Sequence, residues 1–204
     1  MDYVNQLEVF ERHVVPLLDA DGFTGSNGTW RRTIESVINC VEIQVKSDKS
    51  ACCVNLGVHF TFLPVVGGSQ GVDIDNLLQS DCELKTRLAW EGESGHWWPF
   101  DDAERNAIDM AACFTQIGKA FFARFSQFPH PFLDIDLKDI ASDANSNLFP
   151  MMTKVRKVLL LARIHDYLGH ADAVVPLCNL GIEVAGMASG PKAAFRDLLR
   201  KYKS

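Results

Sequence analysis

The feature that most constrains this chain is a strict alternation of side chains over residues 51–62. Every second position is apolar, and these positions hold Cys52, Val54, Leu56, Val58, Phe60 and Phe62. The positions between them hold Cys53, Asn55, Gly57, His59 and Thr61. A period of two places the two sets on opposite faces of an extended strand. The chain therefore needs a sheet in which this strand buries its apolar face.

Three more segments have strand character, which gives a sheet of four strands. They cover residues 29–34, 37–46 and 82–90. The connections are short, except for the loop of residues 64–80, and Asn27-Gly28 is a turn signal ahead of the first segment. Short connections favour an antiparallel meander, because parallel neighbours need long crossovers.

Helical periodicity flanks this block of strands. Residues 3–18 repeat apolar side chains at the spacing of one helix face. Asp101 and Glu104 resemble a capping box at the start of a long helix that extends to about residue 128. Strands in one block with helices around them predict an α+β fold. We expect a four-stranded antiparallel sheet packed by the N-terminal helix and the long following helix.

The last third of the sequence is helical. The three predicted helices of this extension cover residues 150–168, 172–187 and 191–204. Gly169 ends the first of them, and Pro191 stands at a favoured first helical position. A shorter helix is expected at 137–143. We therefore expect an α+β domain over residues 1–128 and a helical extension over residues 129–204 that docks on it.

The composition excludes several classes of function. The chain has 26 acidic and 20 basic residues, and its formal net charge of -6 disfavours general binding to nucleic-acid phosphates. Residues 50–72 contain no Asp, Glu, Lys or Arg, but their glycines and Pro64 make them a poor membrane span. The first residues lack the basic and apolar regions of a signal peptide. We expect a cytoplasmic protein without membrane attachment.

The six cysteines show no C-x-x-C spacing and no paired ligand spacing. In a chain without a secretion signal, such cysteines are expected to be reduced, buried thiols. The sequence also has no P-loop, no G-x-G-x-x-G and no G-x-S-x-G. We therefore predict neither a structural zinc site nor a cofactor.

A set of short motifs within residues 1–128 resembles a known family. The motifs are Gly22-Phe23, Thr29-Trp30-Arg31, Gln44 with Lys46-Ser47, residues 54–58, Cys82 with Arg87-Leu88, and Trp97-Trp98 before a helix. In their order and spacing they resemble a bacterial family catalogued as domain of unknown function 4304. The family pattern reads Q-x-S, whereas here Lys46 takes the serine position and Ser47 follows it. The resemblance implies an α+β domain without an established activity, of a kind often found in toxin–immunity neighbourhoods.

The polar positions of the predicted sheet form the first candidate site. In a meander these positions share one face, together with Glu42, Glu83 and Lys85. A sheet covered on one side is polar on the other in any case, so the functional interpretation is a groove for a ligand or partner. The adjacent tryptophans would form its rim, one buried and one partly exposed, because consecutive residues of an extended chain point in opposite directions. The candidate binding residues are Gln44, Lys46, Asn55, His59, Arg87, Trp97 and Trp98.

Two catalytic arrangements are alternatives. His165-Asp166, with His170 close in sequence, resembles the His-Asp pair of metal-dependent phosphohydrolases. Neighbouring residues on a helix diverge by about 100°, which argues against a shared metal. Cys53 could instead act as a nucleophile beside His59 on the polar sheet face.

These patterns favour a binding protein over an enzyme. Arginine and tryptophan on one face are typical of interface anchors. We predict a non-enzymatic binding or protein-interaction module, immunity-like or regulatory, whose partner is a protein of unknown identity. One alternative is the metal-dependent phosphohydrolase, and another is a small-ligand-binding protein with its site on the polar sheet face.

Overall fold

The computed structural model describes residues 3–65, 71–142, 148–149 and 152–202. Two compact units make up the chain, Met1–Ser126 and Gln127–Ser204. Within the described ranges, no helix combines the length and apolar character that a membrane span requires.

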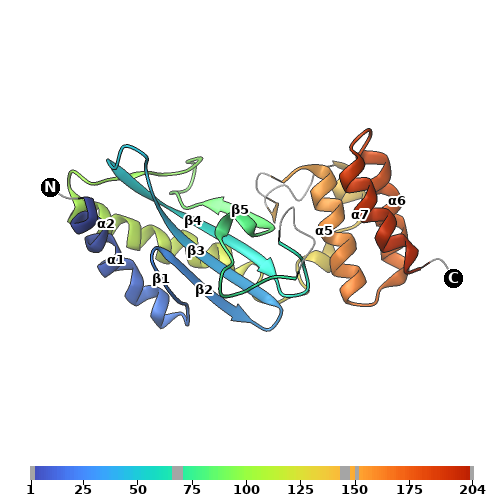
Figure 1. The fold of residues 1–204 in the computed structure, drawn as a ribbon, viewed down its shortest axis with the longest axis horizontal. Coiled ribbons are helices and arrows are strands. Elements are labelled where there is room, and N and C mark those ends of the chain that lie inside the picture. Colours follow the sequence, from blue (N-terminus) through green and yellow to red (C-terminus); the bar gives the residue numbers. More distant parts are fainter. Residues whose placement is uncertain (1–2, 66–70, 143–147, 150–151, 203–204) are drawn as a thin grey trace. The chain divides into compact units, whose positions relative to one another are not determined.

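An antiparallel sheet forms the centre of the first unit (Figure 1). Its strands are β1 (Thr24–Ser26), β2 (Thr29–Ile34), β3 (Val37–Val45), β4 (Ala51–Phe60), β5 (Leu84–Arg87) and β6 (Trp98–Pro99). They pair in the order β1-β2-β3-β4-β5, and β6 pairs with another part of β4. The predicted α+β class and the antiparallel pairing are confirmed.

The expected number of four strands is wrong, because the described residues form a sheet of six. The two additional strands, β1 and β6, contain three and two residues. Segments this short cannot show a period of two, and β1 also contains Gly25. The turn signal at Asn27-Gly28 does mark a hairpin, since both residues have positive φ between β1 and β2.

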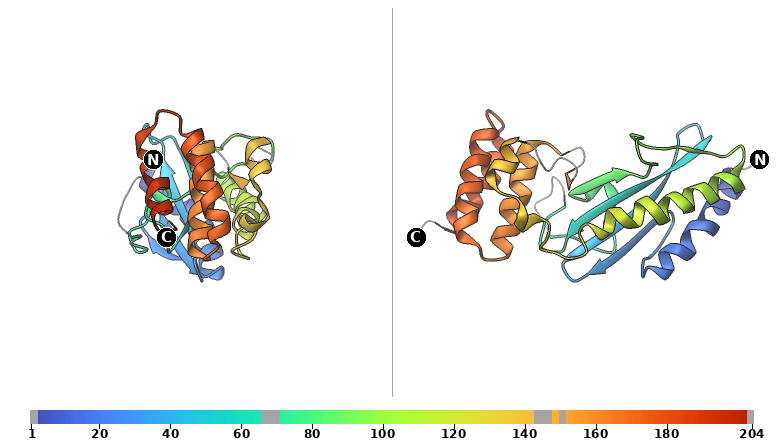
Figure 2. Two further views of the ribbon diagram at one scale, coloured as in Figure 1. Left: turned by 90° about the vertical axis from the view of Figure 1, so that its right-hand side faces the viewer. Right: turned by 180° about the vertical axis from the view of Figure 1, so that it is seen from behind.

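Helices cover one face of the sheet. These are α1 (Tyr3–Ala20), α2 (Ala103–Cys113), the π-helical turn η2 (Phe114–Gly118) and α3 (Lys119–Ala123). Figure 2 shows α1 and α2 side by side in front of the strands when the molecule is seen from behind. Phe10 and Phe100 meet edge to face in this layer, with ring centroids 5.5 Å apart. The predicted long helix is present, but its helical geometry ends at Ala123, before residue 128.

One end of the second face of the sheet is covered by described residues of the long loop between β4 and β5. Leu77 and Cys82 of this loop pack on Ile38 and Cys40 of β3, and the short helix η1 (Gln79–Asp81) lies between them in sequence. Gly57 allows this approach, because a Cβ there would lie 2.6 Å from Cys82 Sγ. Every residue of β4 is buried, including those at the polar positions.

The second unit consists of helices. They are η3 (Phe132–Asp134), α4 (Leu137–Ser142), α5 (Lys154–Tyr167), α6 (Ala171–Val184) and α7 (Ser189–Arg200). The three long helices and the short helix near residue 137 are present as predicted. Gly169 follows α5 with φ +76°, a conformation that glycine adopts without strain. Gly181 of α6 packs directly against the buried ring of Phe195 of α7.

Candidate functional site

The other end of the second sheet face brings together three of the predicted binding residues. Asn55 of β4 lies directly opposite Arg87 of β5 and Glu42 of β3, and Gln44 lies opposite Cys53. Directly opposed residues of an antiparallel pair project from the same face. The strand register therefore places Gln44, Asn55 and Arg87 next to one another.

Hydrogen bonds connect these side chains into one cluster. Asn55 Nδ2 donates to Gln44 Oε1 at 3.0 Å, and Arg87 Nε donates to Asn55 Oδ1 at 3.2 Å. Arg87 Nη2 also donates to Gln44 Oε1 at 3.5 Å. Both amide oxygens are thus used inside the cluster, which leaves donor groups on its outer side.

Trp97 completes this group, which we call the Arg87 cluster: Gln44, Asn55, Arg87 and Trp97. The guanidinium carbon of Arg87 lies 4.7 Å from the centroid of the Trp97 ring. The backbone of Gly95, with φ +148°, passes close to the aliphatic part of the Arg87 side chain. A Cβ added at Gly95 would lie 3.0 Å from Arg87 Cδ. The Arg87 side chain is therefore held by the Trp97 ring, the backbone at Gly95 and the Asn55 amide.

Cys53 lies beneath the cluster and is unsuited to nucleophilic catalysis. Its Sγ lies 3.8 Å from Gln44 Oε1 and 4.0 Å from Asn55 Oδ1. Burial raises the pKa of Cys53 to about 11; the Arg87 charge acts to lower this pKa and Glu42 to raise it. His59 is six positions along the same strand, about 20 Å away at 3.3 Å per residue, so the predicted Cys53–His59 pair is wrong.

The other predicted residues of this face lie outside the cluster. Lys46 forms an ion pair with Asp48 at 3.1 Å in the hairpin after β3. His59 is completely buried, at 0% exposure, and lies opposite Ile38, on which Leu77 and Cys82 of the long loop pack. The expectation of an open polar groove along the whole face is therefore wrong for His59.

The two adjacent tryptophans point to opposite faces. Trp98 lies opposite Cys52 in the sheet and is 1% exposed, whereas Trp97 is partly exposed. Trp98 consequently belongs to the core, and Trp97 belongs to the Arg87 cluster. Of the seven residues proposed from sequence, Gln44, Asn55, Arg87 and Trp97 come together.

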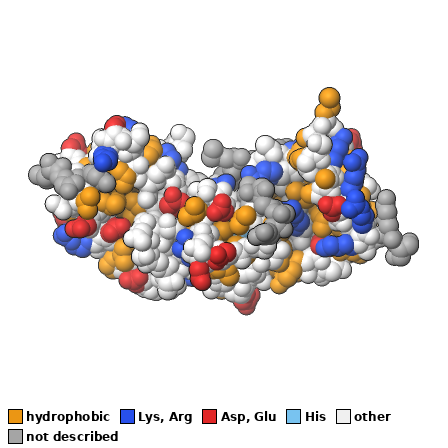
Figure 3. All heavy atoms as spheres, viewed as in Figure 1, with side chains coloured by type: hydrophobic (Ala, Val, Ile, Leu, Met, Phe, Trp, Pro, Cys, Tyr) orange, Lys and Arg blue, Asp and Glu red, His pale blue; other side chains and the backbone are white. Residues whose placement is uncertain are grey.

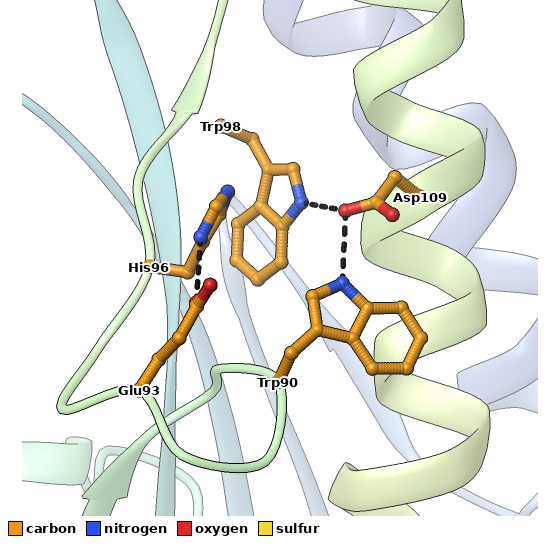
Figure 4. A network of polar contacts seen from close by, with 5 residues as sticks. All are labelled: Trp90, Glu93, His96, Trp98 and Asp109. Atoms are coloured by element: carbon orange, nitrogen blue, oxygen red, sulfur yellow. Dashed lines mark hydrogen bonds and ion pairs between the residues drawn. The ribbon is translucent and has the colours of Figure 1, made fainter.

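A polar network that the sequence did not reveal holds the segment carrying Trp97 (Figure 4). Asp109 Oδ2 of α2 accepts hydrogen bonds from the indole nitrogens of Trp98 at 2.8 Å and Trp90 at 3.2 Å. His96 Nδ1 and Glu93 Oε2 are 2.9 Å apart, and the His96 ring lies 4.6 Å from that of Trp98. Asp109 directly precedes the buried Met110 in α2, a helix that packs on the sheet. This position beside a core residue was the only feature of the sequence that could have indicated a role for Asp109.

The predicted alternative in the second unit does not converge on one centre. His165 Nδ1 lies 3.3 Å from His170 Nδ1, and burial first and the neighbouring His170 second lower the pKa of His165. Asp166 instead accepts hydrogen bonds from Lys201 Nζ at 2.6 Å and Tyr202 Oη at 2.7 Å. In the described part of the chain, no three His, Cys, Asp or Glu side chains are grouped so that they could hold a metal ion.

A protein-family model with the description Domain of unknown function (DUF4304) matches residues 14–122. Searches of curated proteins and of solved structures gave no significant match. The matched residues include the whole Arg87 cluster and Asp109, and they exclude the helices of the second unit. Because the match covers more than half of the sequence, the chain belongs to the DUF4304 family, as its short motifs predicted.

Proposed function

We propose that this chain is a binding module whose Arg87 cluster docks a carboxylate-bearing segment of a partner protein. The observation that carries the proposal is the position of Arg87, held between the Trp97 ring and the Asn55 amide. An exposed arginine normally loses rotamer freedom when it binds, and here that freedom is already restricted. The side chain is therefore preorganised to receive an anion.

The donors on the outer side of the cluster suit a carboxylate. Among the described residues, neither Arg87 Nη1 nor Gln44 Nε2 takes part in a hydrogen bond, whereas both amide oxygens are engaged. A guanidinium edge matches the two oxygens of a carboxylate and forms short, charge-assisted bonds with them. The partly exposed Trp97 adds an aromatic surface beside these donors, and tryptophan with arginine is a common pair at interface hot spots.

The charge around the cluster favours a protein over a nucleic acid. Glu42 lies two strands away from Arg87 on the same face, about 10 Å at the usual strand spacing. Acidic and basic side chains are interspersed over the visible face of the first unit (Figure 3). A nucleic acid carries a charge at every phosphate, so its backbone would be repelled by the carboxylates around the Arg87 cluster. A peptide with single acidic residues could place one carboxylate at Arg87 and avoid the others.

A displayed peptide library tests the proposal. Peptides selected on the full chain are resynthesised, and their affinities are measured by calorimetry before and after Asp→Asn and Glu→Gln replacement. We expect the acidic peptides to bind and their neutral versions to bind at least about tenfold more weakly, since charged hydrogen bonds contribute about 1.5–3 kcal/mol. Arg87→Gln and Trp97→Ala should weaken the same peptides similarly.

Lys46→Gln is the matched control, because Lys46 is an exposed cation near the same face but outside the cluster. Its affinity should stay within about twofold of the parent value, since surface ion pairs contribute little. Unchanged circular dichroism spectra establish that each variant is folded. Peptides that bind Arg87→Gln as tightly as the parent chain would refute the proposal, and selective binding of a small anion alone would replace the protein partner with a small ligand.

A further inference from the structure

A cavity of about 260 Å³ lies on the other, helix-covered face of the sheet. Its wall is formed by Arg32 and Ile34 of β2, Asn39 of β3, Lys119 and Phe122 of α3, and Asp21 after α1, among others. All of these residues belong to the first unit. The Arg87 cluster projects from the opposite face, so this cavity is a separate site.

Two polar atoms in the cavity wall lack partners. Asn39 is 3% exposed, and its Oδ1 is buried without a hydrogen bond to any described residue. Arg32 lies directly opposite Asn39 in the β2–β3 pair, and its Nε is also buried without an acceptor among the described residues. Buried polar groups in proteins nearly always have partners, so two unsatisfied ones side by side mark a place where water or a ligand would complete the hydrogen bonds.

The charge of the wall favours an anion. Its charged residues are Arg32, Lys119 and Asp21. Lys119 Nζ pairs with Asp21 Oδ1 at 2.8 Å, whereas Arg32 donates only to the backbone oxygen of Asp21 and stacks over Phe23 at 4.5 Å. The single carboxylate of Asp21 thus faces two cations, Lys119 and Arg32, and the described wall carries a net positive charge.

The rest of the wall is apolar and the space is small. Ile34, Val37 and Phe122 provide aliphatic and aromatic contacts. The volume lies below the range of about 300–1,000 Å³ that is usual for drug-sized ligands. Because Asn39 Oδ1 makes no hydrogen bond, rotation of the amide could present Nδ2 to a ligand without breaking a contact.

We propose that this cavity binds a small monocarboxylate with a short apolar stem. The carboxylate accepts hydrogen bonds from Arg32 and the rotated Asn39 amide, and the stem packs on Phe122 and Ile34. Lys119 at the rim adds long-range attraction for the anion. This site is independent of the proposed partner surface.

Calorimetry and NMR titration of the full chain with isovalerate and benzoate test the proposal. We expect saturable binding, chemical-shift changes at Arg32, Asn39 and Phe122, and a rise in the thermal midpoint with ligand concentration. Isovaleramide has the same shape without the charge and should bind at least tenfold more weakly. Acetate and inorganic phosphate, which lack the stem, should bind equally weakly.

Variants on both faces separate this site from the Arg87 cluster. Asn39→Leu, Arg32→Met and Lys119→Met should each weaken isovalerate binding, the first two by tenfold or more. Arg87→Gln should leave it unchanged. If Arg32→Met does not fold, Asn39→Leu and Lys119→Met still decide the outcome. Equal binding of acid and amide, unaltered binding by Asn39→Leu, shift changes confined to the Arg87 cluster, or no binding at all would overturn the proposal.

Discussion

Asp109 shows how a single, partly buried carboxylate can position a neighbouring surface. One of its oxygens accepts both the Trp98 and the Trp90 indole N–H groups. These tryptophans enclose the segment that carries Gly95 and Trp97, and that segment holds Arg87. The geometry of the Arg87 cluster therefore depends on a residue that lies outside it.

Asp109→Leu should destabilise the first unit by about 1–3 kcal/mol, because the buried indole N–H of Trp98 is left without its acceptor. Urea unfolding followed by circular dichroism measures this change. Glu91→Leu, at an exposed position of the same segment, is the control and should change stability by less than about 0.5 kcal/mol. A urea midpoint for Asp109→Leu equal to that of Glu91→Leu would contradict the role of Asp109 as the acceptor that holds this segment.

The cysteines behave as interior residues, and this has a measurable pH dependence. All six are free and buried. Burial raises the pKa of Cys52 and Cys113 to about 12 and that of Cys178 to about 11, from 9.0. Above pH 9 the unfolded chain loses thiol protons that the folded chain keeps. The contribution of these thiols to the free energy of unfolding should therefore be fully present below pH 9 and should decline as the pH rises toward 12.

Urea midpoints between pH 7 and 10.5 check this decline, and Cys113→Ala should reduce its slope because one raised pKa is removed. A second measurement uses a thiol reagent at pH 8, which attacks the thiolate. The native chain should react slowly and the urea-unfolded chain rapidly at all six cysteines. Fast reaction of the native chain would show that the thiols are not protected.

At the scale of elements, the close contact of α6 with α7 depends on one glycine. A Cβ at Gly181 would lie 2.1 Å from the Phe195 ring, which is fully buried. Gly181→Ala should therefore lower stability by about 1–3 kcal/mol, the usual cost of overpacking. Gly190→Ala is the matched control, because nothing lies within 4 Å of its added Cβ.

Thermal melts of the two variants give the comparison. Gly190→Ala should be neutral or stabilising by up to about 1 kcal/mol, since alanine restricts the unfolded chain. Equal melting of Gly181→Ala and Gly190→Ala would show that the helices can separate enough to accept the methyl group.

The elements also show which parts of the structure the sequence could predict. The alternation of residues 51–62 correctly predicted β4, because that signal is local. It could not show that the polar position of His59 is buried, since the covering comes from a non-periodic loop more than ten residues away. Gln44, Asn55 and Arg87 followed from the strand register, whereas Asp109 lay in a helix whose partner strands are distant in sequence.

The division into two units gives a prediction for the whole molecule. The family match ends inside the first unit, and the second unit contains buried residues of its own, such as Phe132, Leu161 and Phe195. Residues 1–126 and 127–204, expressed separately, should each give a cooperative thermal transition, the second with a purely helical circular dichroism spectrum. A second fragment that is unfolded alone would show that it needs the first.

The opposite orientation of Trp97 and Trp98 gives the chain two spectroscopic reporters one residue apart. In the unsubstituted chain labelled with 5-fluorotryptophan, which keeps every indole N–H, the fluorine resonance of Trp97 would respond to a partner arriving at the Arg87 cluster, because this ring is partly exposed. Trp98 is 1% exposed, and its resonance would shift only when water enters the core. A single titration read through the two resonances would therefore distinguish occupancy of the surface from loosening of the interior.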